Sequence, residues 1–344
     1  MLRHGIAGAT RAGYRRHFRK YVDFAAANGL EPGPPSEIDL MFFACHLAKS
    51  EQSAPATIKA TLSGVSDGFV ARGYSSPLRD RYGVILPRLA RTMRGISRKF
   101  SRARRTRLPL TTDKLKAVLA AIEGSGRSKW DKRMLAAALT LGAFLMLRVS
   151  EFTSPGIRSH NPRMGACLEG IEFLPSIDDP KFVVLNVKVS KTDPFRDGID
   201  LRMAANGTKC CPVNRAAKYV RMRINRGGDP KSPLFLLKGG AFLTRDRLQR
   251  GMRSGLTAAG LDAAKYATHS LRIGGACSLA ASGWDSASIQ TFGRWRSDAF
   301  LSYIRVSDQM LRKASKSMAG ITKQDLLSAK RAGRGHKWVT GLSW

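Results

Sequence analysis

The sequence lacks the cysteine patterns of disulfide-rich and zinc-binding proteins. Its five cysteines are odd in number and show no CxxC spacing, which excludes a disulfide framework and a cysteine-ligated zinc site. The adjacent pair Cys210 and Cys211 is more typical of loop packing than of redox chemistry. Unpaired cysteines favour a reducing interior such as the cytosol or the nucleus.

Long apolar runs and nucleotide-binding motifs are also missing. The longest apolar run, Met134 to Leu147, has about 14 residues, which is too short to cross a bilayer and predicts a buried helix. The first residues carry charges but no apolar core, so no secretion signal is expected. Without a carboxylate cluster or a GxxxxGK[ST] motif, the sequence predicts no metal and no nucleotide cofactor. We therefore expect neither a cofactor nor a membrane partner.

Acidic residues are scarce relative to basic ones. Lys and Arg total 59 against 25 Asp and Glu, which gives a formal net charge of +34. Self-repulsion of this charge destabilises the compact state, and a polyanionic partner relieves it. Nucleic acid is the favoured partner, with binding that weakens as salt rises because counterions are released. The alternatives are a well-solvated basic surface and a basic RNA-binding protein.

The length and the residue pattern indicate two domains, because 344 residues exceed what one compact domain usually needs. Residues 1–97 predict a small helical DNA-binding domain, and 98–107 predict an extended basic linker. Residues 108–330 predict a second domain of helices around one small antiparallel sheet, followed by a tail over 331–344. The expected fold class is mainly α with a small antiparallel β-sheet.

Apolar residues recur at helical spacing through the first domain, as Tyr14, Phe18 and Tyr21 do. Ser36 is expected to cap a second helix, and Gly73 to follow a third. Basic residues between the apolar ones predict a surface that faces DNA, made by Arg15, Arg16 and Arg19. Six of the ten linker residues are basic. The linker is expected to follow the DNA backbone through Arg102, Arg104, Arg105 and Arg107.

The second domain begins with a predicted helix after Thr111 and continues with the buried helix. Apolar residues then alternate, first at Val183, Leu185 and Val187 and again from Ile199, which predicts two antiparallel strands. Lys191 falls in the connection between them. A lysine at such a position is usually idle, but it can also reach into a groove.

Four residues of this domain, together with Lys191, suggest one reaction. His269 and Arg272 are three residues apart and lie on one face of a predicted helix. Arg148 follows the apolar run, either as a helix C-terminal charge or as a rigid anion clamp. Tyr303 lies on a further helix that Ser297 or Asp298 can cap. Each residue taken alone is more often an ordinary surface or core residue.

The chemistry that unites these residues is attack on a phosphodiester. Two guanidinium groups can bind the nonbridging oxygens with bidentate geometry. A tyrosine has a pKa of about 10, so its activation needs nearby cations and a base such as His269. A lysine in the groove can donate a proton to the leaving hydroxyl. Because a covalent phosphotyrosine conserves bond energy, rejoining needs no ATP.

The order of these residues resembles the tyrosine recombinases, the phage-integrase type of site-specific recombinase. The resemblance covers nearly the whole chain and includes Arg148 and Glu151 in RVSE, the HxxR pair, and Trp295 after a glycine. It implies a helical core-binding domain and an integrase-type catalytic domain that form a clamp around duplex DNA. Tyr303 lies eight residues after Trp295, where many family members have nine. The chain resembles the eukaryotic transposon branch, the DIRS-like and Crypton-like elements, more than it resembles the bacterial Xer proteins.

The resemblance also implies a role for each residue. Tyr303 is the nucleophile that becomes linked to the DNA 3′ end, Arg148 and Arg272 bind the phosphate, and His269 is a base or hydrogen-bond donor. Lys191 is the general acid, with Lys188 as the fallback. Trp295 donates its indole N–H to the phosphate, and Glu151 orients Arg148 or His269. Four protomers act on two DNA sites.

Three other functions remain open at this point. A type IB topoisomerase or a telomere resolvase uses the same chemistry, but the small helical first domain favours a recombinase. A DNA-binding relative without activity is the second, although the complete residue set argues against decay. A basic RNA-binding protein with a chance motif is the third, and it would lack any cleavage activity.

Overall fold

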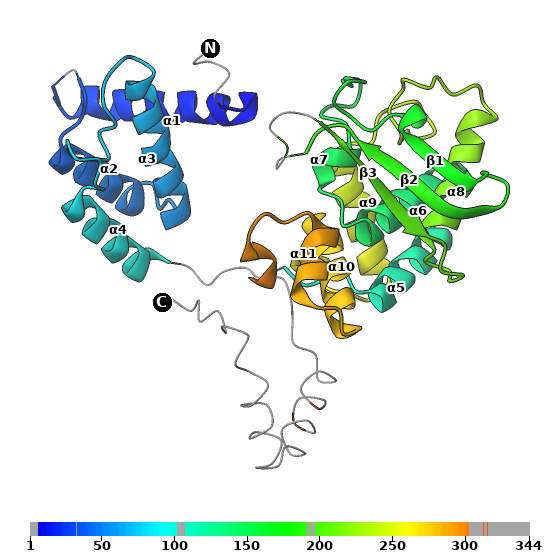
Figure 1. The fold of residues 1–344 in the computed structure, drawn as a ribbon. Helices are drawn as coiled ribbons and strands as arrows, with labels where there is room; N and C mark the ends of the chain where they lie inside the picture. The colour runs from blue at the N-terminus through cyan, green and yellow to red at the C-terminus, as the bar shows by residue number, and fades with distance from the viewer. Residues whose placement is uncertain are drawn as a thin grey trace, which may run out of the picture. The chain divides into compact units, whose positions relative to one another are not determined.

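The computed structural model describes residues 6–31, 33–101, 107–190, 193, 197–302, 312 and 315. The chain divides into two compact units, residues 1–105 and 106–344 (Figure 1). Helices build the described part of the first unit, and the second unit adds one three-stranded antiparallel sheet. The predicted fold class is therefore confirmed. Within the described ranges, no helix is both long enough and apolar enough to cross a membrane.

The first unit contains helices that begin at recognisable sequence signals. Ser36 caps the second helix as predicted, because its hydroxyl accepts from the Asp39 N–H at 3.2 Å while the Asp39 carboxylate accepts from the Ser36 N–H at 2.9 Å. Proline opens the next two helices, where its missing N–H is not needed. The helices are α1 (Gly8–Ala27), α2 (Glu37–Lys49), α3 (Pro55–Val70) and α4 (Pro87–Phe100).

The core of the first unit depends on close packing of α1 against α3. A Cβ at Gly68 would lie 1.9 Å from the Phe18 ring, and one at Gly64 would lie 2.6 Å from His17 Cβ, so only glycine fits at either position. The Phe18 ring then meets Phe69 edge-on, with ring centroids 5.2 Å apart. This contact turns the basic face of α1 away from the core. The other buried apolar residues include Tyr21, Leu40, Phe43, Ile58, Leu62, Val65, Leu89 and Ile96.

The expected linker over 98–107 is wrong at its start, because residues 98–100 belong to α4. The physical reason is the apolar stripe of this helix, which Phe100 extends beyond Ile96 by packing against the core. Of the linker arginines, Arg102, Arg104 and Arg105 lie outside the described residues. Arg107 is described, and its guanidinium donates to the Ala264 carbonyl at 2.6 Å.

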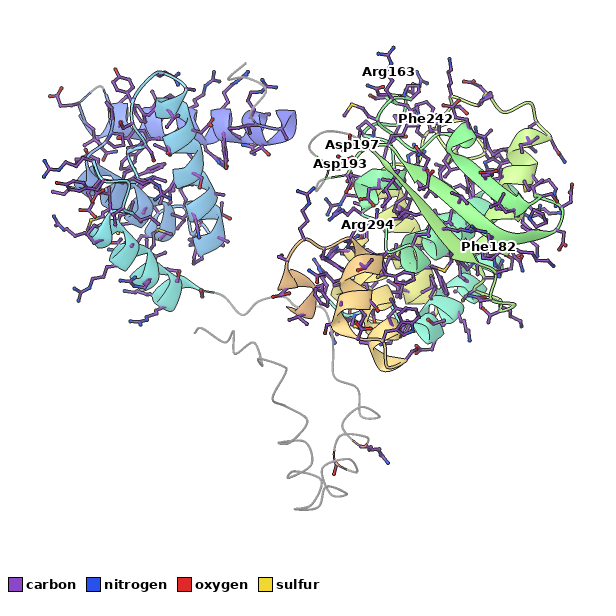
Figure 2. The ribbon with its side chains drawn as sticks, viewed as in Figure 1. Arg163, Phe182, Asp193, Asp197, Phe242 and Arg294 are labelled. Atoms are coloured by element: carbon purple, nitrogen blue, oxygen red, sulfur yellow. The ribbon has the colours of Figure 1, made fainter. Side chains whose placement is uncertain are left out.

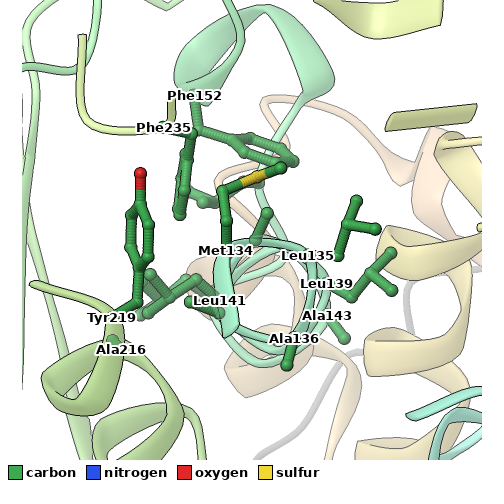
Figure 3. Close-up of a cluster of buried hydrophobic side chains, with 14 of the residues drawn as sticks. Met134, Leu135, Ala136, Leu139, Leu141, Ala143, Phe152, Ala216, Tyr219 and Phe235 are labelled. Carbon is green, nitrogen blue, oxygen red and sulfur yellow. The ribbon is translucent and has the colours of Figure 1, made fainter. Parts of the chain in front are cut away.

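The second unit is organised around one buried helix. Every residue of α6 (Lys129–Phe144) from Met134 to Ala143 is buried. Side chains of this helix pack with Phe152, Tyr219 and Phe235, which come from other segments (Figure 3). The surrounding helices are α5 (Thr112–Glu123), α7 (Val149–Phe152), α8 (Pro212–Ile224), α9 (Arg245–Ala258), α10 (His269–Ala281) and α11 (Ser286–Gly293). Short 3₁₀ turns are η2 (Leu168–Gly170), η3 (Ala263–Lys265) and η4 (Asp298–Ser302).

The sheet has the strand order β1-β2-β3, with β1 (Ile171–Pro175), β2 (Pro180–Val187) and β3 (Ile199–Ala204). Both pairings are antiparallel, so the predicted pair of strands around residues 188–198 is confirmed. Val183, Leu185 and Val187 are fully buried on one face, which fixes the register of the central strand. Lys191 lies in the β2–β3 connection but outside the described residues.

The apolar run Met134–Leu147 was expected to form one helix, and this expectation is wrong at its end. The helix α6 stops at Phe144, and Met146 adopts a left-handed conformation with φ of 46°. The Leu147 N–H donates to the Gly142 carbonyl at 3.0 Å, and the Met146 N–H donates to the Ala143 carbonyl at 3.3 Å. These two bonds form a Schellman motif, which reverses the chain. Arg148 therefore precedes α7 as its N-cap residue and is not a C-terminal charge of α6.

Helix α10 begins at His269, as the HxxR spacing predicts, and approaches its neighbours at two glycines. A Cβ at Gly274 would lie 2.0 Å from the Leu110 carbonyl oxygen, and one at Gly275 would lie 2.6 Å from the Ala143 carbonyl oxygen. Gly274 thus lets the backbone of α10 lie against Leu110, and Gly275 lets it lie against the end of α6. This contact positions Arg272 next to the turn at Met146.

We expect Gly274→Ala to destabilise the second unit, because the added methyl group meets backbone that cannot move without displacing α10. Overpacking of this kind costs about 1–3 kcal/mol or more, which corresponds to a fall in Tm of at least about 3 °C. Gly126→Ala is the matched control, since a Cβ there meets nothing within 4 Å. Thermal unfolding followed by circular dichroism measures both, and an unchanged Tm for Gly274→Ala would contradict this packing.

Candidate active site

A buried carboxylate, Glu151, holds together the residues that the sequence separates. It is 3% exposed. Its Oε1 accepts from Arg148 Nη1 at 3.0 Å and from Ser190 Oγ at 3.0 Å. Its Oε2 accepts from the Arg148 N–H at 2.8 Å and from Arg294 Nη2 at 3.2 Å. A buried charge is tolerated only when it is paired and hydrogen-bonded, and Glu151 meets this condition fully.

Arg272 is 1% exposed and joins two turns of the backbone. Its Nη1 donates to the Met146 carbonyl at 2.5 Å, and its Nη2 donates to the Gly293 carbonyl. The Met146 carbonyl is available because the left-handed turn ends α6 at that point. The guanidinium of Arg272 is therefore bonded to Met146, which is only two positions before Arg148, although the two arginines are far apart in sequence.

Arg294, which Figure 2 labels, adds a third guanidinium to the same cluster. Its Nη2 donates to Glu151 Oε2 and, at 3.2 Å, to the same Met146 carbonyl that accepts from Arg272. Burial lowers the pKa of the Arg294 guanidinium, Glu151 opposes this change, and the charge of Arg148 adds to it. The sequence reasoning missed Arg294. Its only sequence signal is its place between Gly293 and Trp295.

His269 lies at the first position of α10, on the same helix as Arg272. Its side chain retains contact with solvent. Partial desolvation lowers the pKa of His269, and the positive charges of Arg272, Arg148 and Arg245 lower this pKa further. His269 is therefore neutral at neutral pH and can accept a proton or a hydrogen bond. Arg245, the first residue of α9, is a second cation that the sequence reasoning missed.

Trp295 covers the guanidinium of Arg272, whose Cζ lies 4.4 Å from the indole centroid. Phe300 also stacks on the indole, with 5.6 Å between the ring centroids. Gly293 makes this arrangement possible, because a Cβ there would lie 1.5 Å from the indole ring. Phe300 belongs to η4, which ends at Ser302. Tyr303 is the next residue and lies outside the described residues.

The β2–β3 connection is tied to the same cluster by Ser190. This hydroxyl bonds both Arg148 Nη1, at 2.7 Å, and Glu151. Ser190 immediately precedes Lys191 in the sequence. By contrast, the ammonium of Lys188 bonds the Pro162 carbonyl at 2.9 Å and Glu169 Oε1 at 3.2 Å. These contacts take Lys188 away from Arg148, so the fallback assignment of the proton donor gains no support from the geometry.

The structure thus brings together the five predicted site residues that it describes, which are Arg148, Glu151, His269, Arg272 and Trp295. Their surroundings are cationic and suit an anion, since guanidinium groups bind phosphate oxygens in bidentate fashion. Within the described ranges, no group of three or more His, Cys, Asp or Glu side chains could hold a metal ion.

The predicted DNA-facing residues of α1 are exposed. Arg15 and Arg19 line a groove of about 1110 Å³ on the first unit, together with Arg11 and Arg72. Arg16 is also exposed. A second basic face, missed by the sequence reasoning, follows α4, where exposed arginines recur at helical spacing. Its members are Arg88, Arg91, Arg94 and Arg98.

Comparison with solved structures identifies the fold. The chain superposes on the XerH site-specific recombinase bound to palindromic difH substrate with a TM-score of 0.60 and 16% identity, covering 90% of this chain and 79% of that chain. The Tn1549 transposon integrase in complex with circular intermediate DNA gives a TM-score of 0.58 at 13% identity, covering 91% and 94%. A lambda integrase dimer bound to a core site gives 0.51 at 16%, covering 87% and 72%. The chain therefore has the fold of the tyrosine recombinases.

Sequence comparisons give no further match. No family model matches the chain. No curated protein matches it either. The subfamily expectation, the DIRS-like and Crypton-like branch, stays a prediction.

His269 should make the stability of the protein depend on pH. Its folded-state pKa lies below the ordinary value of 6.5. The unfolded chain therefore binds the proton more readily, and folding is penalised as pH falls through about 6.5. We expect wild type to lose more unfolding free energy than His269→Gln between about pH 7.5 and about pH 5. Urea unfolding at both pH values measures the difference, and equal losses in the two proteins would contradict the assigned surroundings of His269.

Proposed function

We propose that this protein is a site-specific DNA recombinase that cleaves and rejoins strands through a 3′-phosphotyrosine intermediate. The observation that carries the proposal is the convergence of three guanidinium groups around the Glu151 carboxylate and the Met146 carbonyl, within the fold of the tyrosine recombinases. These groups belong to Arg148, Arg272 and Arg294, and His269 lies on the same helix as Arg272. Three cations next to a neutral imidazole form an environment for a phosphodiester. The reaction uses neither a metal ion nor ATP.

In the cleavage step, the Tyr303 hydroxyl oxygen attacks the scissile phosphorus. A bond forms between that oxygen and phosphorus, and the bond from phosphorus to the 5′ oxygen breaks. Negative charge builds up on the nonbridging oxygens, where Arg148 and Arg272 stabilise it. Removal of one such preorganised donor costs on the order of 100- to 1000-fold in rate. The phosphotyrosine retains the energy of the phosphodiester, so attack by a 5′-hydroxyl restores the DNA.

Two protons move in this step. His269 accepts the phenol proton, since its lowered pKa keeps it neutral at neutral pH. Lys191 donates a proton to the leaving 5′ oxygen. Its sequence neighbour Ser190 supports this role, because that hydroxyl is bonded to Arg148 and Glu151. Glu151 is a positioning residue that orients Arg148, and Trp295 donates its indole N–H to the phosphate while packing on Arg272.

Double-stranded DNA is the proposed partner. The net charge of +34 and the exposed arginines of α1 support it. The XerH, lambda integrase and Tn1549 integrase structures contain DNA, which is consistent with this partner. The described linker residue Arg107 and the undescribed Arg102, Arg104 and Arg105 are proposed to contact the DNA backbone. This function implies that the protein acts inside the cell, bound to DNA.

We further propose that four protomers act on two DNA sites. An apolar pocket of about 250 Å³ in the second unit supports this assembly. Trp284 and Phe292 line it and are 46% and 42% exposed. The proposed occupant is the C-terminal segment of a second copy, which carries Met310, Leu311, Ile321, Leu326 and Leu327. If each of the four protomers passes its C-terminal segment to the next, a cyclic head-to-tail arrangement fills every pocket.

The most direct test of the activity is trapping of the covalent intermediate. Nicked duplexes made from the DNA that flanks the protein's own coding sequence lose a short fragment on cleavage, so the adduct accumulates. We expect a DNA-linked band on a denaturing gel for wild type and none for Tyr303→Phe. Retention of the band in Tyr303→Phe would contradict the nucleophile. Tight DNA binding without any adduct in wild type would instead support a DNA-binding relative without activity.

The proposed DNA surface of α1 has its own test. Each phosphate contact contributes about 0.9 to the slope of log K against log salt. We expect Arg19→Gln to reduce this slope by about one and to weaken binding to all DNA sequences alike. Lys181→Gln is the matched control, because Lys181 is also exposed but pairs with Asp179 at 2.8 Å. Fluorescence anisotropy between about 50 and about 200 mM salt measures the slopes. An unchanged slope for Arg19→Gln would remove α1 from the interface.

A further inference from the structure

Arg294 stands out among the side chains of the active-site cluster. Its Nε and Nη1 are buried and have no hydrogen-bond partner among the residues that the structure describes. Its Nη2, by contrast, is bonded to Glu151 and to the carbonyls of Leu145 and Met146. A buried donor without a partner destabilises the folded state. The cluster therefore keeps a guanidinium whose bonding capacity is largely unused.

The backbone of Arg294 carries a second cost. The residue is left-handed, with φ of 56° and ψ of 45°, at the end of α11. The Trp295 N–H donates to the Gln290 carbonyl at 3.1 Å, and the Arg294 N–H donates to the Thr291 carbonyl at 3.0 Å, which is again a Schellman motif. Glycine is favoured at this position, because a residue with a side chain is strained in the left-handed conformation. If residue 294 had only a structural role, glycine would fill that role with less backbone strain.

Charge balance gives a reason for an arginine at this place. Arg148, Arg272 and Arg294 contribute three positive charges, and Glu151 contributes one negative charge. In the ground state, with His269 neutral, the cluster has two positive charges in excess, whereas the phosphodiester carries one negative charge. Attack by the Tyr303 oxygen places a second negative charge on the oxygens around phosphorus, while the phenol proton moves to His269. Without Arg294 the ground-state excess would be one, and no surplus guanidinium charge would face the developing negative charge.

We propose that Arg294 is the third cationic group of the phosphate site and stabilises the charge that develops on the nonbridging oxygens. This inference rests on the proposed strand-cleavage function. The guanidinium adjoins both phosphate-binding arginines, since it shares the Met146 carbonyl with Arg272 and the Glu151 carboxylate with Arg148. Its unpartnered nitrogens are shielded from water, so its charge acts at short range with little screening.

A neutral phosphate analogue tests this role. In a methylphosphonate, a methyl group replaces one nonbridging oxygen, so the transition state carries one negative charge less. We expect Arg294→Gln to slow covalent adduct formation on ordinary nicked DNA by about 100- to 1000-fold. On the same DNA with a methylphosphonate at the scissile position, we expect a loss below about tenfold. Equal losses on both substrates would contradict a role that depends on the charge of the phosphate.

Two further variants complete the experiment. Arg296→Gln is the matched control, because Arg296 is exposed and only two residues away, and it should cleave both substrates like wild type. Arg294→Lys keeps the charge, so it should retain most of the activity on ordinary DNA. If thermal unfolding shows that Arg294→Gln does not fold, the activity of Arg294→Lys decides whether the charge of residue 294 matters. A folded Arg294→Lys that is more than about 100-fold slower on both substrates would overturn the charge role.

The outcomes separate this inference from the proposed function. An adduct in wild type together with an unimpaired Arg294→Gln overturns the role of Arg294 and leaves the recombinase proposal standing. Equal losses on the two substrates likewise overturn the charge role. No adduct in wild type on either substrate refutes the proposed function and, with it, the inference.

Discussion

Three guanidinium groups meet in this protein around one buried carboxylate and one backbone carbonyl. Like charges at this distance repel, and their burial is tolerated because Glu151 accepts from Arg148 and Arg294 while the Met146 carbonyl accepts from Arg272 and Arg294. Removal of the carboxylate would leave buried cations uncompensated. The second unit can be understood as a scaffold that brings these acceptors to one place.

Two left-handed turns provide that scaffold. Helices α6 and α11 both end in Schellman motifs, and the residues at the left-handed positions are Met146 and Arg294, not glycine. The turn at Met146 exposes its carbonyl, and the turn at Arg294 directs the neighbouring Gly293 carbonyl toward Arg272. Close packing at Gly274 and Gly275 then holds α10, with Arg272 and His269, against the first turn. Backbone strain and tight packing thus occur where the cations converge.

Much of this arrangement follows from local sequence signals. The HxxR spacing predicted a helix with both side chains on one face, and α10 begins at His269. The alternation at Val183, Leu185 and Val187 predicted the central strand and its burial. Ser36 predicted a helix start, since a side-chain cap is a local interaction. The resemblance to tyrosine recombinases predicted the fold that the solved structures share.

Other features depend on contacts between distant residues and could not be predicted in this way. The end of α6 at Phe144 is set by a left-handed methionine inside an apolar run, where periodicity gives no stop signal. Residues 98–100 carry the charge of a linker, but Phe100 packs against the first core and keeps them helical. Arg294 joins the cluster only through Glu151 and Met146, which are more than a hundred residues away.

The scissile phosphate is proposed to bind at this cluster. A crystal structure of the protein on nicked DNA, with vanadate in place of that phosphate, would show the binding position directly. We expect a five-coordinate vanadate linked to Tyr303, with guanidinium nitrogens of Arg148 and Arg272 on its equatorial oxygens and Glu151 still bonded to Arg148 and Arg294. A vanadate bound away from these arginines, or one contacted by the Glu151 carboxylate in their place, would contradict this proposal.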